Sequence, residues 1–145
     1  MPPLQPEYTI EVTEVDRPED RAAILEGLMQ FNQRNAPPAN FQLLGLFLKS
    51  PEGKTIGGLW GRSAYQWLFV ELLFIPEPLR HTGLGTAILK QAEQVARDRG
   101  CLGVWLDTFT FQALDFYRKL GYTVFGELKD HPRGISQYWL QKRLD

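Results

Sequence analysis

The chain has 145 residues, a length typical of one domain, and 43% of its residues are hydrophobic. The net charge is −1 and the sequence has no basic block, so it does not indicate a positively charged surface that would bind nucleic acid. No apolar run is long enough to cross a membrane. One cysteine excludes an internal disulfide, and two isolated histidines are too few for a metal site, so we expect no bound metal. We therefore predict a cytoplasmic single domain over residues 1–145, with the proline-rich residues 1–6 as a flexible tail.

The first 40 residues predict a strand, a helix and a loop. Residues 8–14 alternate between apolar and polar side chains, which is typical of a strand. Asp16, followed by an early proline and acidic residues, indicates a helix start, and the apolar positions that follow keep helical spacing (Ala23, Ile24, Leu28, Phe31). The proline-rich residues 35–40 end this helix.

The middle of the chain predicts three strands that form a meander, separated by turns, at residues 41–49, 54–64 and 67–75. A glycine-containing loop follows, and then an amphipathic helix over residues 86–99 that stops at Gly100.

The last third begins with the almost wholly apolar residues 101–106, which are typical of a buried central strand. Cys101 starts this strand, so we expect its thiol to be buried and inert rather than nucleophilic. A short helix over residues 112–120 and a strand pair at 122–128 and 136–142 complete the chain. The order β-α-β-β-β-α-β-α-β-β predicts an α/β (α+β) fold with a mixed, mostly antiparallel central sheet flanked by helices.

Residues 80–86, Arg-His-Thr-Gly-Leu-Gly-Thr, join a predicted strand to a predicted helix. Free backbone N–H groups and the positive dipole at a helix start favour phosphate, and glycines let an anion approach the backbone. A P-loop is excluded, because residues 80–86 contain no Gly-Lys-Ser/Thr, and the Gly-Lys-Thr at residues 53–55 has Leu48 where the pattern needs its first glycine. Gly83 and Gly85 fit a dinucleotide fingerprint, but Ile88 stands at its third position. From this loop alone, two alternative interpretations remain: an unrelated nucleotide-binding domain, and a helix start that binds no ligand.

Two motifs together resemble one family. The pattern R-x-x-G-x-G in residues 80–86 resembles the pyrophosphate loop of the GNAT acetyltransferases, and residues 113–122 resemble their signature A-x-x-F-Y-x-K-L-G-F/Y. The resemblance covers residues 55–142, and the first 50 residues share only the order of elements. The chain looks like a member of a bacterial subgroup of small GNAT proteins. It implies the GNAT fold and transfer of an acetyl group from acetyl-CoA to an amine in a ternary complex.

The resemblance also implies where acetyl-CoA is held. The loop backbone would grip the pyrophosphate, at Arg80, His81, Thr82, Gly83, Leu84, Gly85 and Thr86. The end of the third meander strand would pair with the pantetheine arm and offer an N–H to the thioester carbonyl, at Leu73, Phe74 and Ile75. Many members carry an asparagine where this chain has Phe111, so the neighbouring Gln112 is the candidate for that contact.

Tyr117 is the candidate general acid, because the resemblance places it near the coenzyme sulfur. A tyrosine has an ordinary pKa near 10 and can donate a proton at pH 7. The alternative is a core tyrosine on an amphipathic helix.

Glu71 is the candidate base. If the strand at 67–75 alternates regularly, Glu71 is a lone carboxylate in an apolar row, where such groups often gain a pKa suited to a base. The alternative is a structural carboxylate paired with an arginine such as Arg62.

The acceptor site is less well marked. We predict substrate contacts from Phe31, Asn32, Trp60 and Glu71, with further candidates at Asn35, Tyr65, His131 and Arg133, each of which could also be ordinary core or surface. Because these candidates include aromatic residues and few acids, we expect a small, partly apolar amine as the partner. We expect no nucleic acid or membrane as a partner. The last strand pair is a place where a homodimer could form. A protein lysine or N-terminus as acceptor, a longer acyl group, and a non-catalytic acyl-CoA sensor are the alternatives.

Overall fold

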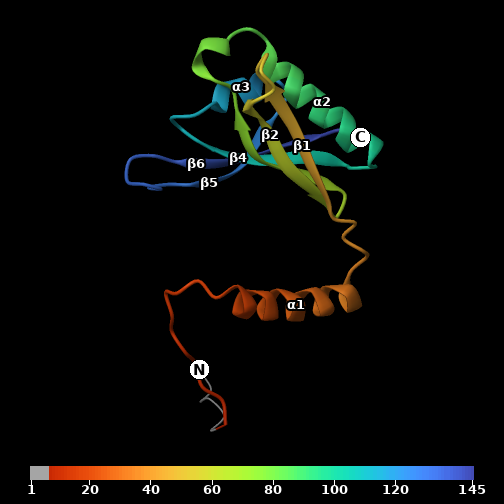
Figure 1. The fold of residues 1–145 in the computed structure, drawn as a ribbon, viewed down its shortest axis with the longest axis vertical. Helices are drawn as coiled ribbons and strands as arrows, with labels where there is room; N and C mark the ends of the chain where they lie inside the picture. The colour runs from red at the N-terminus through yellow and green to blue at the C-terminus, as the bar shows by residue number, and fades with distance from the viewer. Residues whose placement is uncertain (1–6) are drawn as a thin grey trace. The chain divides into compact units, whose positions relative to one another are not determined.

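The computed structural model describes residues 7–145, which divide into two compact units, one that ends at Pro37 and one that spans Pro38–Asp145 (Figure 1). The first unit contains helix α1 (Pro18–Asn35), with a proline in its first turn followed by Glu19 and Asp20. Its N-cap residue is Arg17, not Asp16, and the Arg17 guanidinium contacts the Asp20 carboxylate at 3.1 Å. In the described residues no helix is both long enough and apolar enough to cross a membrane.

The strand predicted at residues 8–14 is wrong, because these described residues carry no strand. Alternation supplies one face to bury, but a strand also needs a neighbour for its ladder of hydrogen bonds. The segment is held locally instead: the Val15 N–H donates to Thr13 Oγ1 at 3.1 Å, and Arg17 bonds Glu11 at 2.8 Å. The single-domain prediction stays a prediction, and the predicted tail at 1–6 lies outside the described residues.

The second unit is built on one six-stranded sheet with the order β1-β2-β3-β4-β6-β5 (Figure 1). Four of its pairings are antiparallel and only β3–β4 is parallel, which confirms the predicted mixed, mostly antiparallel sheet. The strands are β1 (Gln42–Lys49), β2 (Thr55–Ala64), β3 (Trp67–Phe74), β4 (Gly103–Phe109), β5 (Thr123–Leu128) and β6 (Gln137–Arg143). The helical elements are η1 (Glu77–Leu79), α2 (Leu84–Asp98) and α3 (Leu114–Lys119).

Helix α2 covers one face of the sheet and closes the core of this unit. Its buried residues Leu89, Ala92 and Ala96 belong to the same core as strand residues such as Leu68 and Val104. Gly100 follows the helix with φ +78°, the left-handed conformation that ends helices, as its position predicted. Cys101 is buried in this core, which confirms the predicted burial, and burial raises the pKa of its thiol, as expected for a thiol that does not act as a nucleophile.

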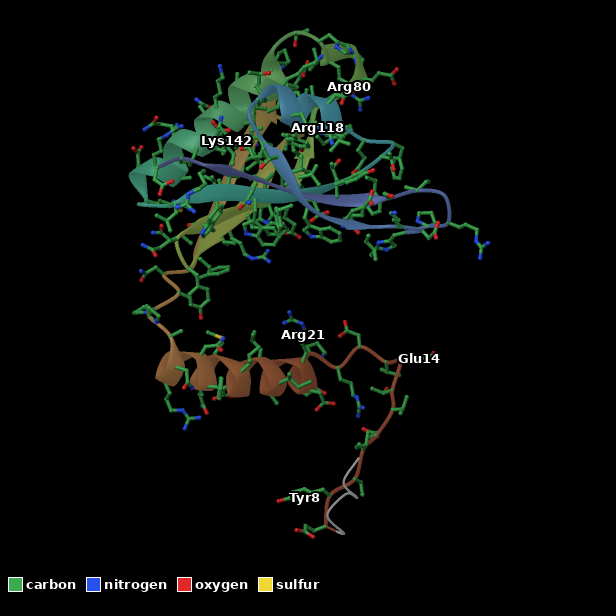
Figure 2. All side chains as sticks on the ribbon, turned by 180° about the vertical axis from the view of Figure 1, so that it is seen from behind. Tyr8, Glu14, Arg21, Arg80, Arg118 and Lys142 are labelled. Atoms are coloured by element: carbon green, nitrogen blue, oxygen red, sulfur yellow. The ribbon has the colours of Figure 1, made fainter. Side chains whose placement is uncertain are left out.

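A buried polar cluster ties α2 to the end of the chain. Glu93 of α2 is only 3% exposed, and its carboxylate accepts hydrogen bonds from the Tyr122 hydroxyl at 2.8 Å and from Lys142 Nζ at 3.0 Å. Figure 2 labels Lys142 on β6. Because each charge in this cluster has a partner, burial of the carboxylate is tolerated.

All four tryptophans lie on the other face of the sheet. Side chains alternate along a strand, so residues next to buried core positions such as Leu59, Leu68 and Leu140 point away from α2. Within residues 38–145 neither α2 nor α3 covers this face, which we call the aromatic face. Its tryptophans are Trp60, Trp67, Trp105 and Trp139.

Candidate active site

Strands β3 and β4 separate within the sheet. Their parallel pairing runs only from Trp67–Gly103 to Val70–Leu106, although β3 continues to Phe74 and β4 to Phe109. Peptide groups beyond that point have no partner strand across the gap, so those that face it can bond an external extended group. This gap is the opening that we refer to below.

Glu71 is the extra residue of a β-bulge at this opening. Trp60 pairs with Leu72 and Gly61 pairs with Val70, which leaves Glu71 without an opposite residue on β2. The bulge reverses the alternation: Leu73 packs against the core, whereas Phe69 faces the aromatic side. The predicted shared face for residues 67–75 is therefore wrong, because regular alternation fails at a bulge.

The surroundings of Glu71 also differ from the prediction. Its side chain is 45% exposed and its Oε2 lies 3.5 Å from Nη1 of Arg62, so it is not a lone carboxylate in an apolar row. The Arg62 guanidinium in turn lies 4.8 Å from the centroid of the Phe69 ring. The alternative pairing with Arg62 is confirmed, and the role of Glu71 as a base stays a prediction.

The glycine loop ends in an uncapped helix start. Gly83 is the N-cap of α2 in the left-handed conformation, with φ +88°, and no side chain caps the first turn. The first N–H groups of a helix have no partners inside it, so this end can bind an anion. A Cβ at Gly83 would meet nothing within 4 Å, whereas one at Gly85 would lie 3.3 Å from Cζ of Phe116. Gly83 therefore leaves space open, and Gly85 permits close packing.

Two side chains of the loop fold back on the segment before it. The Arg80 Nε–H donates to the Ile75 carbonyl at 2.9 Å, and its guanidinium lies 5.8 Å from the Phe74 ring centroid. The Thr82 hydroxyl donates to the Leu79 carbonyl. These contacts hold the loop against the end of β3. Figure 2 shows Arg80 and Arg118 of α3 at the end of the unit where α2 begins.

Tyr117 is the buried residue of helix α3 and belongs to the core of the second unit. It is 7% exposed, and its ring makes edge contacts with Phe116 at 5.2 Å and Tyr122 at 5.9 Å between centroids. No hydrogen bond reaches its hydroxyl from residues 7–145, unlike the Tyr122 hydroxyl that donates to Glu93. Burial, and then the charge of Asp107, raises the pKa of Tyr117 to about 12. Tyr117 is therefore a protonated donor at neutral pH.

Asp107 was not singled out as a site residue from the sequence. It is the first residue of β4 after the paired segment ends at Leu106, and the Gln137 side-chain Nε2–H donates to its Oδ1 at 3.0 Å. The available signal was its position as the first charged residue after the apolar run 101–106. Such positions at strand ends often line sites in mixed and parallel sheets.

Gln112 closes the turn after β4. Its Oε1 accepts hydrogen bonds from the Phe109 N–H at 2.8 Å and the Thr108 hydroxyl at 3.1 Å. Among the described residues, only the Nε2 group of this side chain remains without a partner. A contact between Gln112 and the cofactor stays a prediction, and it would use this amide nitrogen. The neighbouring Phe111 stacks on Phe109 at 5.3 Å.

The predicted acceptor residues are distributed over both units. Phe31 and Asn32 lie on α1 in the first unit, and the Asn35 side chain there donates to the Phe31 carbonyl at 2.8 Å. Trp60 lies in the second unit beside the bulge and stacks on Phe47 at 6.2 Å. The remaining candidates lie in turns of the second unit, at Tyr65, His131 and Arg133. Only Trp60 and Glu71 are brought together with the opening by strand register, and their roles stay predictions.

Comparison with known proteins gives concordant matches. The sequence model of the Acetyltransferase (GNAT) family matches residues 7–122. Acetyltransferase Atu2258 of Agrobacterium fabrum is 35% identical over 133 residues, 92% of this chain and 97% of that protein. Blasticidin-S acetyltransferase of Streptomyces morookaense is 33% identical over 127 residues, 87% of this chain and 92% of that protein. A crystal structure of an acetyltransferase from Bacillus cereus superposes with a TM-score of 0.83 at 33% identity and covers 92% of this chain and 98% of that one.

Proposed function

This chain belongs to the GNAT acetyltransferase family and is an acyltransferase, and we propose that it moves an acetyl group from acetyl-CoA to the amine of a small molecule. The observation that carries the proposal is the arrangement of three features at one end of the sheet. These are the uncapped start of α2, the gap between β3 and β4, and the unpartnered hydroxyl at the tip of the largely buried Tyr117 side chain.

The chain fits acetyl-CoA through backbone groups. The first-turn N–H groups of α2, beside the open space at Gly83, are suited to the pyrophosphate, and residues 80–86 are the proposed contacts. Arg80 contributes chiefly by holding the loop, because its Nε is bonded to the Ile75 carbonyl. The unpaired edge of β3 at Leu73, Phe74 and Ile75 is suited to an extended arm, much as one strand accepts another.

Different residues of the chain would carry out different steps of acyl transfer. Acetyl-CoA, when bound, supplies the activated acyl group as a thioester. A backbone N–H at the end of β3 would polarise its carbonyl. The Tyr117 hydroxyl keeps its proton at neutral pH and would donate it to the departing sulfur. Glu71 would accept the proton that the attacking amine loses, either directly or through a water molecule. These are the roles that we assign to the two residues.

A small-molecule acceptor is favoured by the relatives. The name of the Streptomyces protein states that its substrate is blasticidin S, and its similarity spans 87% of this chain. The aromatic face beside the opening supports a partly apolar acceptor, because aromatic side chains stack well on flat groups. Dimerisation through β5 and β6 remains a prediction.

Calorimetric titration of the full chain tests the donor first. We expect acetyl-CoA and desulfo-coenzyme A to bind with similar affinity, and ATP and NAD to compete with neither. Thiol release with a panel of small amines then tests the transfer. Absence of acetyl-CoA binding at near-millimolar concentration would overturn the proposal, whereas binding without transfer to any amine would favour a sensor.

A further inference from the structure

Asp107 lies among three aromatic side chains on the aromatic face. Trp105 and Phe109 stand two residues before and after it on β4, and Trp139 is its directly paired residue on β6. Side chains two apart on a strand share a face about 7 Å apart, and directly paired residues are closer still. The carboxylate therefore has an aromatic neighbour on each side along its strand and another across it.

The rings around Asp107 are fixed by contacts of their own. Trp105 stacks on Phe69, with ring centroids 4.1 Å apart and planes 23° from parallel. Phe109 stacks on Phe111 and also makes an edge contact with His131 at 5.6 Å. Rings that are held in this way offer a preformed surface, so a ligand has less side-chain freedom to immobilise on binding.

A hollow of about 390 Å³ lies between Trp105 and Trp139. Trp67, Phe125 and Gln141 complete its lining, which contains no charged residue. The hollow is shallow, closer to a flat surface than to an enclosed cavity, and its apolar lining with few polar groups resembles that of small-molecule sites. The hollow can take a flat ring, while the charged group nearest to both tryptophans in the strand pairing is Asp107.

The charge of Asp107 is not neutralised by the described residues. Its Oδ1 accepts a hydrogen bond from Gln137, and no lysine, arginine or histidine of residues 7–145 forms an ion pair with it. A partly buried carboxylate without a cation is costly, and a ligand ammonium would satisfy it. The faces of Trp and Phe rings attract the same cation. The carboxylate and the rings thus select one kind of ligand.

We propose that Asp107, with the rings of Trp105 and Trp139, binds the acceptor as a cationic amine carried on a flat apolar ring. This inference rests on the proposed acetyl transfer and names the class of its acceptor. Asp107 directly follows the last residue of β4 that pairs with β3, so in this scheme it holds the amine at the opening, where we place the acyl group. Gln137 is a positioning residue, because it fixes the carboxylate and touches no acceptor in this scheme.

The test removes the charge and keeps the hydrogen bond. In Asp107→Asn the side-chain oxygen can still accept from Gln137, so we expect the fold to be kept. Glu127→Gln on β5, which β6 separates from β4, is the control with the same charge change. Three probes separate charge from ring: 2-phenylethylamine is cationic with a ring, n-butylamine is cationic without one, and aniline has a ring but is neutral at pH 7. Their dissociation constants are measured by ligand-observed NMR on the full chain with saturating desulfo-coenzyme A.

For the wild-type chain we expect 2-phenylethylamine to bind more tightly than either of the other probes. Asp107→Asn should weaken 2-phenylethylamine about tenfold or more and leave aniline within about twofold. Trp139→Leu should weaken the ring-bearing probes and spare n-butylamine. Glu127→Gln should change none of them.

Equal effects of Asp107→Asn and Glu127→Gln, or a wild-type chain that binds 2-phenylethylamine no better than aniline, would overturn the inference. A wild-type chain that binds none of the amines would overturn it as well. The acetyl-CoA titration reports on the proposed function separately, because a chain that binds acetyl-CoA but fails the amine tests loses only this inference. A chain that does not bind acetyl-CoA loses the proposed function itself.

Discussion

Val70 of β3 and Leu106 of β4 are the last residues that the two parallel strands pair, and the strands diverge directly after them. The next residues, Glu71 and Asp107, are both acidic, so each strand places a carboxylate where the opening begins. Glu71 has a cation, Arg62, at 3.5 Å, whereas Asp107 has only the amide of Gln137. Because Glu71 already has a cation beside it, Asp107 is the carboxylate of the two to which we assign a cation-binding role.

Gly83 provides a test of the anion site. Gly83→Ala places a Cβ in space that is open in the structure and forces alanine into φ +88°, which costs about 1 kcal/mol of stability. Gly53, in the turn between β1 and β2, has φ +83° and equally open surroundings, so Gly53→Ala carries the same backbone cost. We expect similar losses of stability in thermal unfolding but weaker acetyl-CoA binding only for Gly83→Ala. Equal acetyl-CoA affinities for the two variants would contradict the site at α2.

Glu71→Gln tests the proton acceptor. The amide keeps the size of the side chain but cannot accept the proton of the amine, so kcat should fall about 100-fold while the affinity for acetyl-CoA is unchanged. An acceptor that is already neutral at the assay pH should lose less, because it gives up one proton in the reaction, whereas an ammonium gives up one before it attacks and a second one afterwards. Steady-state kinetics with a cationic and a neutral amine measure both effects. A variant with the wild-type kcat on the cationic amine would remove Glu71 from the mechanism.

Gln112→Ala tests the turn after β4. The substitution removes an oxygen that accepts from Phe109 and Thr108, which leaves two donors without partners. The free energy of unfolding should fall by about 1–2 kcal/mol, as measured in urea. If the amide Nε2 also donates to the cofactor, acetyl-CoA affinity should fall in both Gln112→Ala and Gln112→Glu, because neither side chain has this donor, whereas stability should fall more in Gln112→Ala, which alone loses the accepting oxygen.

The largely buried side chain of Tyr117 predicts a loss of stability in alkali. Burial, followed by the charge of Asp107, raises its pKa from 10.0 to about 12. Between these values the unfolded chain releases a proton that the folded chain keeps, so the free energy of unfolding falls as the pH rises from about 10 to 12. Below pH 10 both states hold the proton and this contribution does not change. In Tyr117→Phe the fall should be smaller by about 3 kcal/mol, as measured by urea unfolding at each pH.

The sequence predicted those parts of the fold that local pattern determines. The glycine loop, the amphipathic α2 with its stop at Gly100, and the apolar β4 were all placed correctly, because turn chemistry and periodicity act over a few residues. The strand at 8–14 was wrong, because a strand also depends on a partner that alternation cannot supply.

The errors at the site have a related cause. The bulge at Glu71 is a property of the pairing between β2 and β3, and nothing in the strand sequence marks the extra residue. Asp107 was passed over for the same reason, since its importance comes from where β3 leaves β4. Tyr117, in contrast, was found from a motif, and its burial and unpartnered hydroxyl agree with the predicted role without testing it.

The most direct test of the account is the kinetics of Tyr117→Phe with saturating amine, combined with calorimetric titration of acetyl-CoA. The ring contacts with Phe116 and Tyr122 are retained in phenylalanine, so the core should be preserved. We predict that kcat falls about 100-fold, as expected for loss of a general acid, while the dissociation constant for acetyl-CoA stays within about twofold of the wild-type value. An unchanged kcat in a variant that still binds acetyl-CoA would contradict the assignment of Tyr117 as the acid.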